Sequence, residues 1–255
     1  MYFDSHCHLD FDEFAPDRDA VFARSRAAGV SRWMVAGVQA QDWKRQRQLV
    51  RVQNGCEWAV GVHPQFVDQY SADQWVVVLN DLEGAFFRNT PPKAVGEIGL
   101  HRGRGAQETR QATRFVQQLS IARALDVPVI LHVVGLHHQS LAILKDLGPL
   151  PAGGVVHGFT GSKEIAQQYL ELGLHLGISG RWTAGGAKKL ERAIADIDLS
   201  RLLLESDAPD QSPHVGERNE STVILSAAAW LAERKGLTKK AVLVQCSKNA
   251  VSLFG

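Results

Sequence analysis

Short apolar runs alternate with amphipathic stretches along the whole chain. The apolar runs predict eight strands, at residues 2–8, 31–38, 57–63, 94–100, 128–133, 154–159, 174–179 and 202–206. The amphipathic stretches predict helices at residues 17–28, 40–53, 72–88, 109–126, 137–147, 163–172, 188–197 and 220–235, followed by a last helix at about 239–253. The pattern therefore predicts a strand–helix unit repeated eight times, with one extra helix at the C-terminus.

Residues typical of helix ends support these boundaries. Gly148 and Gly236 stand where a residue in the left-handed conformation would end a helix. Ser162 and Thr238 stand directly before helical stretches, where a hydroxyl can accept a hydrogen bond from the first helical turn.

Repeated strand–helix units predict a parallel sheet, because parallel neighbours need crossover connections. Residues 127–131 and 202–204 are apolar at consecutive positions, as expected of strands that are buried on both faces. No linker, repeat or change of composition divides residues 1–255, so we expect a single domain. The alternation alone fits either an open doubly wound sheet or a closed barrel.

Composition and charge narrow the possible classes of protein. Of the 255 residues, 45% are hydrophobic and 22% charged, which is typical of a soluble globular protein. A net charge of +1 provides no general attraction to polyanions, so nucleic-acid binding would need local patches or bound metal. The cysteines are scattered and odd in number, and neither a signal peptide nor an apolar run of about 18 residues is present. We expect a cytoplasmic protein without membrane association, with a monomer favoured.

His6 and His8 close the first predicted strand. Side chains alternate along a strand, so these two imidazoles project to one face while Cys7 points to the opposite layer. Two imidazoles on one side of a strand end can hold one divalent ion. Taken alone, the pair fits equally well two polar residues that merely end a strand.

Other strand ends carry the same kinds of side chain. A histidine or an acid stands at the C-terminal end of six of the eight strands: His6 and His8, His63, Glu97, His132, His157 and Asp207. In a closed barrel all these ends meet at one mouth, where active sites are built. This convergence favours the barrel over the open sheet. We therefore predict an α/β protein, a single-domain (β/α)₈ TIM barrel.

The candidate ligand set is too large for one tetrahedral ion and suits two divalent ions that share a carboxylate. We expect one ion on His6, His8 and Asp207, a second on His132 and His157, and Glu97 as the bridge between them. A water or hydroxide held by both ions is the expected nucleophile, with Asp207 as its proton acceptor. The sequence does not choose between Zn²⁺, Mn²⁺ and Mg²⁺.

Segments 3–10, 61–64, 96–100, 128–132, 157–161 and 204–209, with 218–220 and 249–254 near the end, resemble the TatD family of metal-dependent deoxyribonucleases, within the amidohydrolase-like barrels. The resemblance runs the length of the chain and implies the same six ligands: His6, His8, Glu97, His132, His157 and Asp207. It further implies hydrolysis of phosphodiester bonds in DNA, often from a 3′ end or in a single strand. Two cations suit that reaction because they neutralise the charge that develops on phosphate.

Two positions depart from the family pattern and leave the substrate open. His101 stands where the family usually has Asp, and no Arg follows His132 by two residues. Candidate phosphate contacts are His63, Arg102, Arg104 and Arg218, and Glu205 is a candidate for orienting a ligand without binding the ion itself. His63 also fits a neutral, hydrogen-bonded loop histidine. Arg102 and Arg104 also fit residues of a solvated loop, and Glu205 also fits a member of a structural ion pair.

Other functions remain open at this point. The same two-ion site could hydrolyse a different ester, an amide or a small phosphoester, as the two departures suggest. A non-enzymatic binding scaffold is the third alternative, which a complete set of six ligands disfavours.

Overall fold

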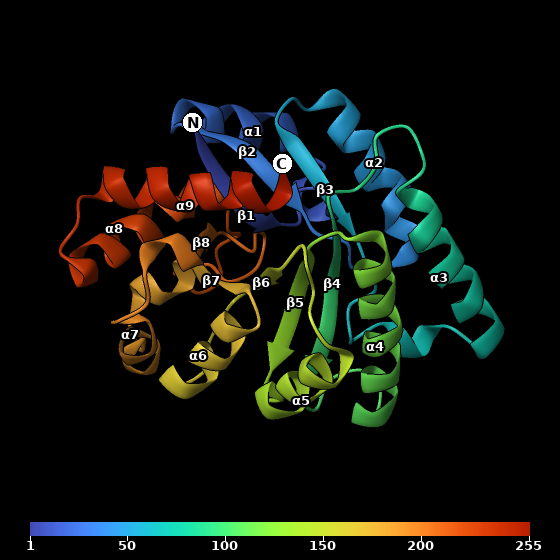
Figure 1. Cartoon of the computed structure of the whole chain (residues 1–255). Coiled ribbons are helices and arrows are strands. Elements are labelled where there is room, and N and C mark those ends of the chain that lie inside the picture. Colours follow the sequence, from blue (N-terminus) through green and yellow to red (C-terminus); the bar gives the residue numbers. More distant parts are fainter.

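Eight parallel strands form one sheet in the computed structural model, which describes residues 1–255 (Figure 1). They follow one another in chain order around the sheet, and each pairs in parallel with the next. The strands are β1 (Tyr2–Cys7), β2 (Val30–Val35), β3 (Cys56–Val60), β4 (Ala94–His101), β5 (Val129–Val134), β6 (Gly154–Val156), β7 (Leu174–Ser179) and β8 (Leu202–Glu205). All eight predicted strands are present.

The first and last strands meet and nearly close the sheet into a barrel. The main-chain N–H of Asp207 donates to the carbonyl of His6 at 2.9 Å, and that of His8 donates to Ala208 at 2.8 Å. Below these bonds, the Asp4 carboxylate accepts from the N–H of Ser206 at 2.8 Å and from its hydroxyl at 2.6 Å. Side chains thus replace part of the backbone ladder at this seam, and the predicted (β/α)₈ barrel is confirmed.

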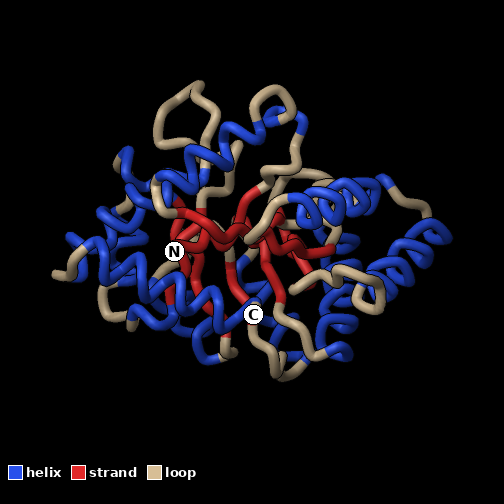
Figure 2. The backbone as a smooth tube through the Cα atoms, turned by 90° about the horizontal axis from the view of Figure 1, so that it is seen from above, coloured by secondary structure: helices blue, strands red, loops and turns tan.

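Helices surround the barrel, as the view from above shows (Figure 2). They are α1 (Arg18–Ala27), α2 (Trp43–Val52), α3 (Ala72–Ala85), α4 (Glu108–Leu125), α5 (His137–Leu147), α6 (Lys163–Glu171), α7 (Lys188–Ile194), α8 (Ile224–Lys235) and α9 (Lys239–Phe254). Both predicted hydroxyl caps form, because Ser162 accepts from the N–H of Ile165 and Thr238 from that of Ala241.

Several predicted boundaries differ from the observed ones near the ends of elements. Predicted helices 40–53 and 220–235 begin with 3₁₀ turns, Ala40–Asp42 and Ser221–Val223, before the α-helix starts. Predicted strands 31–38, 57–63 and 154–159 leave the sheet several residues early. The residues after these strands continue toward the mouth of the barrel with isolated backbone hydrogen bonds in place of a regular ladder, such as those from the N–H of Gly37 to the carbonyl of Gly96 and from the N–H of His63 to that of Val38, both at 3.0 Å.

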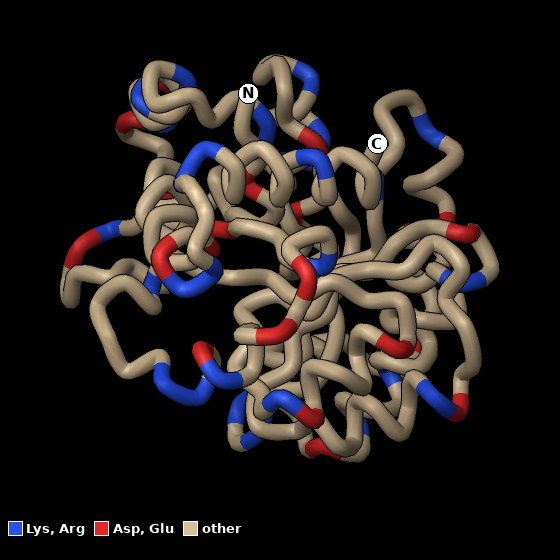
Figure 3. Tube along the Cα trace, turned by 60° about the vertical axis from the view of Figure 1, so that its left-hand side comes forward, with Lys and Arg blue, Asp and Glu red and all other residues tan.

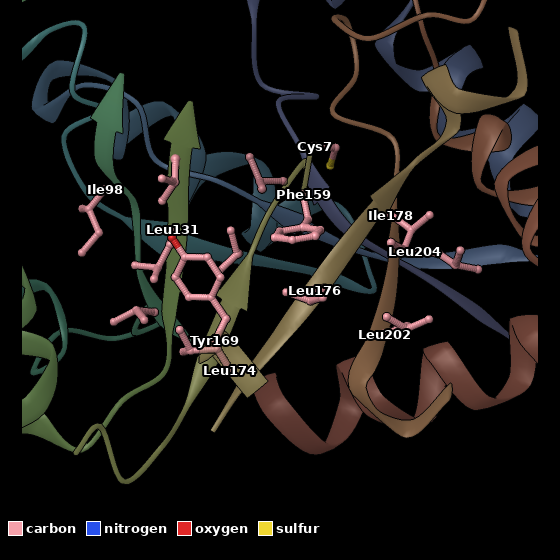
Figure 4. Packing of buried hydrophobic residues seen from close by; sticks show 14 of the residues in the cluster. Cys7, Ile98, Leu131, Phe159, Tyr169, Leu174, Leu176, Ile178, Leu202 and Leu204 are labelled. Atoms are coloured by element: carbon pink, nitrogen blue, oxygen red, sulfur yellow. The ribbon is translucent and has the colours of Figure 1, made fainter. Parts of the chain in front are cut away.

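The core has two layers, as the alternation along buried strands requires. The larger layer lies between strands and helices and includes Leu131, Ile178 and Phe159 (Figure 4). A smaller cluster joins strand residues such as Ile130 to Phe254 of α9. The two layers hold the strands on both faces, so their ends are fixed in space.

Helix α9 crosses the amino ends of the strands, opposite the mouth (Figure 1). Ser247 on this helix accepts a hydrogen bond from the N–H of Phe3 at 3.1 Å. The ring of Phe254 lies 6.2 Å from that of Phe3, and both side chains are buried. The extra C-terminal helix therefore covers that end of the barrel.

No helix is long and apolar enough to cross a membrane. Basic and acidic positions are interspersed along the chain in Figure 3, in keeping with the near-zero net charge. The three cysteines are buried and unpaired.

Candidate metal centre

The six predicted ligands come together at the C-terminal end of the barrel, from β1, β4, β5 and the residues directly after β1, β6 and β8. Asp207 turns toward this centre through a left-handed backbone conformation, with φ of 57°. Five of the six are buried, and His132 is nearly so: His6, His8, Glu97, His132, His157 and Asp207.

The first group of donor atoms surrounds the side chains of β1. The Nε2 atoms of His6 and His8 lie 3.2 Å apart. Oδ1 of Asp207 is 3.3 Å and 3.4 Å from them, and Oε2 of Glu97 is 3.5 Å and 3.6 Å away. Separations of this size are those between neighbouring ligands of a single cation with bonds of about 2.0–2.2 Å.

The second group forms around the other oxygen of Glu97. Oε1 lies 2.5 Å from Nδ1 of His132 and 2.6 Å from Nε2 of His157. These two ring nitrogens are 2.9 Å apart. Each oxygen of Glu97 thus faces a different pair of histidines.

At this centre, burial and the neighbouring charges shift the pKa values of the side chains in opposite directions. Burial works against ionisation of Glu97, but the neighbouring histidines, His157 foremost, outweigh it and hold its pKa well below the usual range. Burial likewise disfavours the charged form of His6, yet Glu97 and Asp207 raise its pKa well above the ordinary value. The centre therefore favours ionised Glu97 and a doubly protonated, positively charged His6 when no cation is bound.

The donor set fits divalent cations on chemical grounds. Imidazole nitrogens of His6 and His8 lie 3.2 Å apart and those of His132 and His157 2.9 Å apart, as nitrogens that share one cation do. No Lys or Arg makes an ion pair with Glu97 or Asp207, so only the histidines balance these buried carboxylates. A cation in each group would satisfy the convergent nitrogens and the carboxylates together.

The centre opens into a cavity of about 890 Å³. Most of the predicted ligands line it, together with two aromatic rings and charged side chains of both signs: Phe11, Phe66, Arg45, Arg104, Asp12, Glu13, Asp42 and Asp210. The cavity is large enough for a nucleotide-sized group, since small-molecule sites span about 300–1,000 Å³.

Of the predicted phosphate contacts, His63 and Arg104 line this cavity. The Nε2 atom of His63 lies 3.7 Å from Oε1 of Glu97, and its Nδ1 accepts a hydrogen bond from the N–H of Gln65 at 3.1 Å. Burial and the nearby His132 lower the pKa of His63 well below its usual value. The structure thus places a neutral imidazole beside the centre.

Two other predicted phosphate contacts, Arg218 and Arg102, do not line this cavity. The guanidinium of Arg218 pairs with the Asp17 carboxylate at 2.7 Å and 2.8 Å and with Glu220 at 3.3 Å. These acids already satisfy the donors that a phosphate would need. Arg102 lies against Gly135 on the neighbouring loop.

Glu205 lies behind His157, on the side away from the cavity. Its Oε1 accepts a hydrogen bond from the N–H of Gly158 and stands 3.8 Å from Nδ1 of His157. Burial raises the pKa of Glu205 to about 7. Gly177 makes room for this carboxylate, because a Cβ there would meet Oε2 at 2.1 Å.

Two contacts of the ligands were missed by sequence reasoning. Gln211 donates to Oδ2 of Asp207 at 2.6 Å, and Nδ1 of His101 lies 2.8 Å from Nε2 of His132. Burial, with the nearby His132 and Arg104, lowers the pKa of His101 to about 4. His101 could have been found, because it stands on the same strand two residues after Gly99, the β4 residue that pairs with His132 of β5, whereas Gln211 stands in a loop with no motif of its own.

A (β/α)₈ barrel with this group of imidazoles and carboxylates at its mouth is typical of the metal-dependent hydrolases. The chain belongs to the TatD family, since the family model described as TatD related DNase matches residues 3–255.

Individual relatives agree with this assignment. The chain is 38% identical over 212 residues to the uncharacterized metal-dependent hydrolase YjjV of Escherichia coli K12, covering 82% of this chain and 80% of the relative. It is 32% identical to the 3′-5′ ssDNA/RNA exonuclease TatD of Klebsiella pneumoniae, covering 99% and 97%. The crystal structure of YjjV superposes with a TM-score of 0.91 at 34% identity, covering 99% of this chain and 97% of that one. The protein is thus a metal-dependent hydrolase of the TatD family.

Proposed function

We propose that this protein is a two-ion deoxyribonuclease that removes nucleotides from the 3′ end of single-stranded DNA. The observation that carries the proposal is the position of Glu97, whose two oxygens each face a separate pair of histidines. A site for one ion would not need a carboxylate at the centre of two donor groups.

In this proposal His6, His8 and Asp207 hold one ion, and His132 and His157 hold the other. Glu97 contributes one oxygen to each. Bound Zn²⁺, Mn²⁺ or Mg²⁺ would stabilise negative charge on phosphate and make a water molecule acidic enough to attack near neutral pH.

Asp207 is proposed to accept the proton of the attacking water. Its Oδ1 faces the two histidines of β1, while its Oδ2 is held by Gln211. The histidines hold the pKa of Asp207 below its usual range despite burial, so the carboxylate is ionised, as a proton acceptor must be.

Glu205 is proposed to support His157 from behind. A ligating histidine commonly donates its second ring N–H to a carboxylate, which fixes the ring orientation. The 3.8 Å separation from Nδ1 of His157 places Glu205 next to that N–H. Neither Nδ1 of His157 nor Oε2 of Glu205 has another hydrogen-bond partner.

A strand end suits the cavity better than a duplex does. Positive charge at the cavity is limited to Arg45 and Arg104, too little to bind the backbone of a long duplex. Phe11 and Phe66 offer rings on which unpaired bases can stack. The relative from Klebsiella pneumoniae named as a 3′-5′ ssDNA/RNA exonuclease supports the same substrate.

An acidic rim favours a second candidate function. Asp12, Glu13, Asp42 and Asp210 line the cavity and would repel a polyanion. A small, weakly charged ester or phosphoester would meet less repulsion at the same two ions.

The decisive experiment combines elemental analysis with digestion of end-labelled DNA. Protein purified without chelator should contain about two ions per chain and shorten single-stranded DNA from its 3′ end. Glu97→Ala should do neither. Stoichiometric metal without release of nucleotides from any DNA or RNA end, but with turnover of small esters, would select the second candidate.

We further propose that residues 1–255 act as one monomeric unit in the cytoplasm. Three buried, unpaired cysteines support a reducing compartment. Light scattering of the metal-loaded protein tests the oligomeric state.

A further inference from the structure

His101 lies in direct contact with a residue of the proposed second ion site. Its Nδ1 is 2.8 Å from Nε2 of His132, and the two rings stack with centroids 5.0 Å apart and planes inclined by 20°. The opposite nitrogen of His132, Nδ1, faces Oε1 of Glu97 at 2.5 Å. His132 therefore stands between Glu97 on one side and His101 on the other.

The positions of the protons follow from this arrangement. An imidazole that binds a cation through Nδ1 presents a lone pair there, so its remaining proton must be on Nε2. The Nε2–H of His132 then donates to Nδ1 of His101. His101 must in turn carry its own proton on Nε2, which makes it a neutral acceptor in a single tautomer.

The backbone of His101 is fixed independently of any cation. Its N–H donates to Oε1 of Gln111 at 2.7 Å, and its carbonyl accepts from Nε2 of the same side chain at 3.1 Å. Gln111 is buried in α4 and also donates to the carbonyls of Arg104 and Ala106. One buried amide thus anchors the end of β4 and the loop after it, so His101 is positioned in advance.

We propose that His101 is a positioning residue that fixes the tautomer and ring orientation of His132 and thereby sets the affinity of the ion on Glu97, His132 and His157. This inference rests on the two-ion site proposed above. A carboxylate at position 101 would accept the same hydrogen bond with a full negative charge and make His132 a stronger ligand. The neutral imidazole accepts without that charge, so this ion is held less tightly than it would be beside a carboxylate.

The effect should be confined to one of the two ions. In the other group, Nδ1 of His8 is 3.3 Å from the carbonyl of Ala36, and Nδ1 of His6 has no partner. Neither ring contacts His101. Removing the acceptor at position 101 therefore affects the ligands of one group directly and leaves those of the other in place.

A series of substitutions at position 101 separates the effect of a hydrogen-bond acceptor from the effect of a negative charge on that acceptor. Oδ1 of Asn or Asp occupies the same place along the side chain as Nδ1 of His. His101→Ala removes the acceptor, His101→Asn keeps a neutral one, and His101→Asp adds the charge. His138→Ala, at an exposed histidine of α5, is the matched control. Each variant is stripped with chelator, checked by thermal melting and titrated with Mn²⁺ by calorimetry and with Co²⁺ by visible absorption.

We expect His101→Ala to weaken one Mn²⁺ site by about 10–100-fold and the other by less than about 3-fold. His101→Asn should bind within a few-fold of the wild type, and His101→Asp at least as tightly as the wild type. His138→Ala should match the wild type at both sites.

Several outcomes would overturn the inference. Unchanged affinity in His101→Ala, equal weakening of both sites, or an Asn variant as weak as the Ala variant would each do so while leaving the two-ion site intact. A wild type that binds only one ion would instead overturn the two-ion site, and this inference with it. A third ion, lost completely in His101→Ala, would make His101 a direct ligand together with His63 and His132, and would likewise overturn its positioning role.

Discussion

Gln211 holds the outer oxygen of Asp207, donating from Nε2 to Oδ2 at 2.6 Å. The inner oxygen, Oδ1, is thereby left facing Nε2 of His6 at 3.3 Å and of His8 at 3.4 Å. One oxygen of this carboxylate thus faces the proposed ion site, while the other accepts a hydrogen bond from Gln211. The roles of the two oxygens can therefore be tested separately.

Asp207→Asn is expected to keep part of the metal and lose most of the rate, by about 10²–10⁴-fold in kcat, because an amide cannot accept the proton of the attacking water. Gln211→Leu should slow turnover by about 10-fold, since it only releases the carboxylate from its orientation. Steady-state digestion of labelled DNA and elemental analysis measure both. Full metal with a near-normal rate in the Asn variant would remove Asp207 from the proton transfer.

Glu97→Ala should abolish turnover and lower the metal content, because one side chain serves both groups of histidines. The matched control is Glu57→Ala, at a half-buried acid on β3 that pairs with Arg32 at 3.1 Å, away from the cavity lining. The control should retain metal and rate. A Glu97→Ala protein with two tightly bound ions would show that the carboxylate is no bridge.

Metal affinity should rise with pH beyond the point at which ordinary histidine ligands level off. The negative charges of Glu97 and Asp207 outweigh burial and raise the pKa of His6 well above 6.5, so the metal-free protein holds a proton there at neutral pH. A cation must displace that proton, and binding becomes tighter as pH rises through the raised pKa. Calorimetry at pH 7 in buffers of different ionisation enthalpy should detect proton release; an affinity that is flat above pH 6.5 would contradict this.

Gly177→Ala should destabilise the protein by about 1–3 kcal/mol, because the added methyl group would overlap the Glu205 carboxylate in a packed interior. Gly84→Ala is the control: it lies in α3 with no atom within 4 Å of the added methyl group. That change should stabilise the helix by about 0.5–1 kcal/mol. Urea denaturation compares the two, and similar stabilities would mean that Glu205 has room to move.

Arg104→Ala should raise KM for single-stranded DNA several-fold and reduce its dependence on salt, because this guanidinium lines the cavity. Arg218→Ala should leave KM unchanged, since its side chain pairs with Asp17 and Glu220. Kinetics at two salt concentrations distinguish them. An equal increase of KM in both variants would mean that the bound strand extends well beyond the cavity.

Much of the fold could be predicted from the sequence because each strand is buried on both faces. Runs such as 127–131 and 202–204 have no polar face, so only a layered α/β arrangement accommodates them. The predicted boundaries that differ from the observed ones lie where strands leave the sheet. Gly61 to His63, for example, continue an apolar pattern, but the regular ladder ends at Val60 and only an isolated backbone hydrogen bond from His63 to Val38 follows.

The proposed ligands could be predicted because a parallel barrel brings all its strand ends to one mouth. Contacts made by loops could not. Arg218 follows a family motif, yet the loop before it brings Asp17 within reach, and that ion pair has no signature in the sequence. Gln211 reaches Asp207 only because both adopt positive φ angles, of 53° and 57°, which local sequence does not predict for these residue types.

The buried rings of Phe3 and Phe254 close the end of the barrel that lies opposite the mouth. In the proposed reaction, a strand end that enters from the mouth could not pass through the packed barrel, so a released nucleotide would depart by the route along which it arrived. Each cleavage is then followed by retreat of the strand before the next residue can advance. Digestion should accordingly be distributive, with partly shortened chains of many lengths accumulating when DNA is in excess.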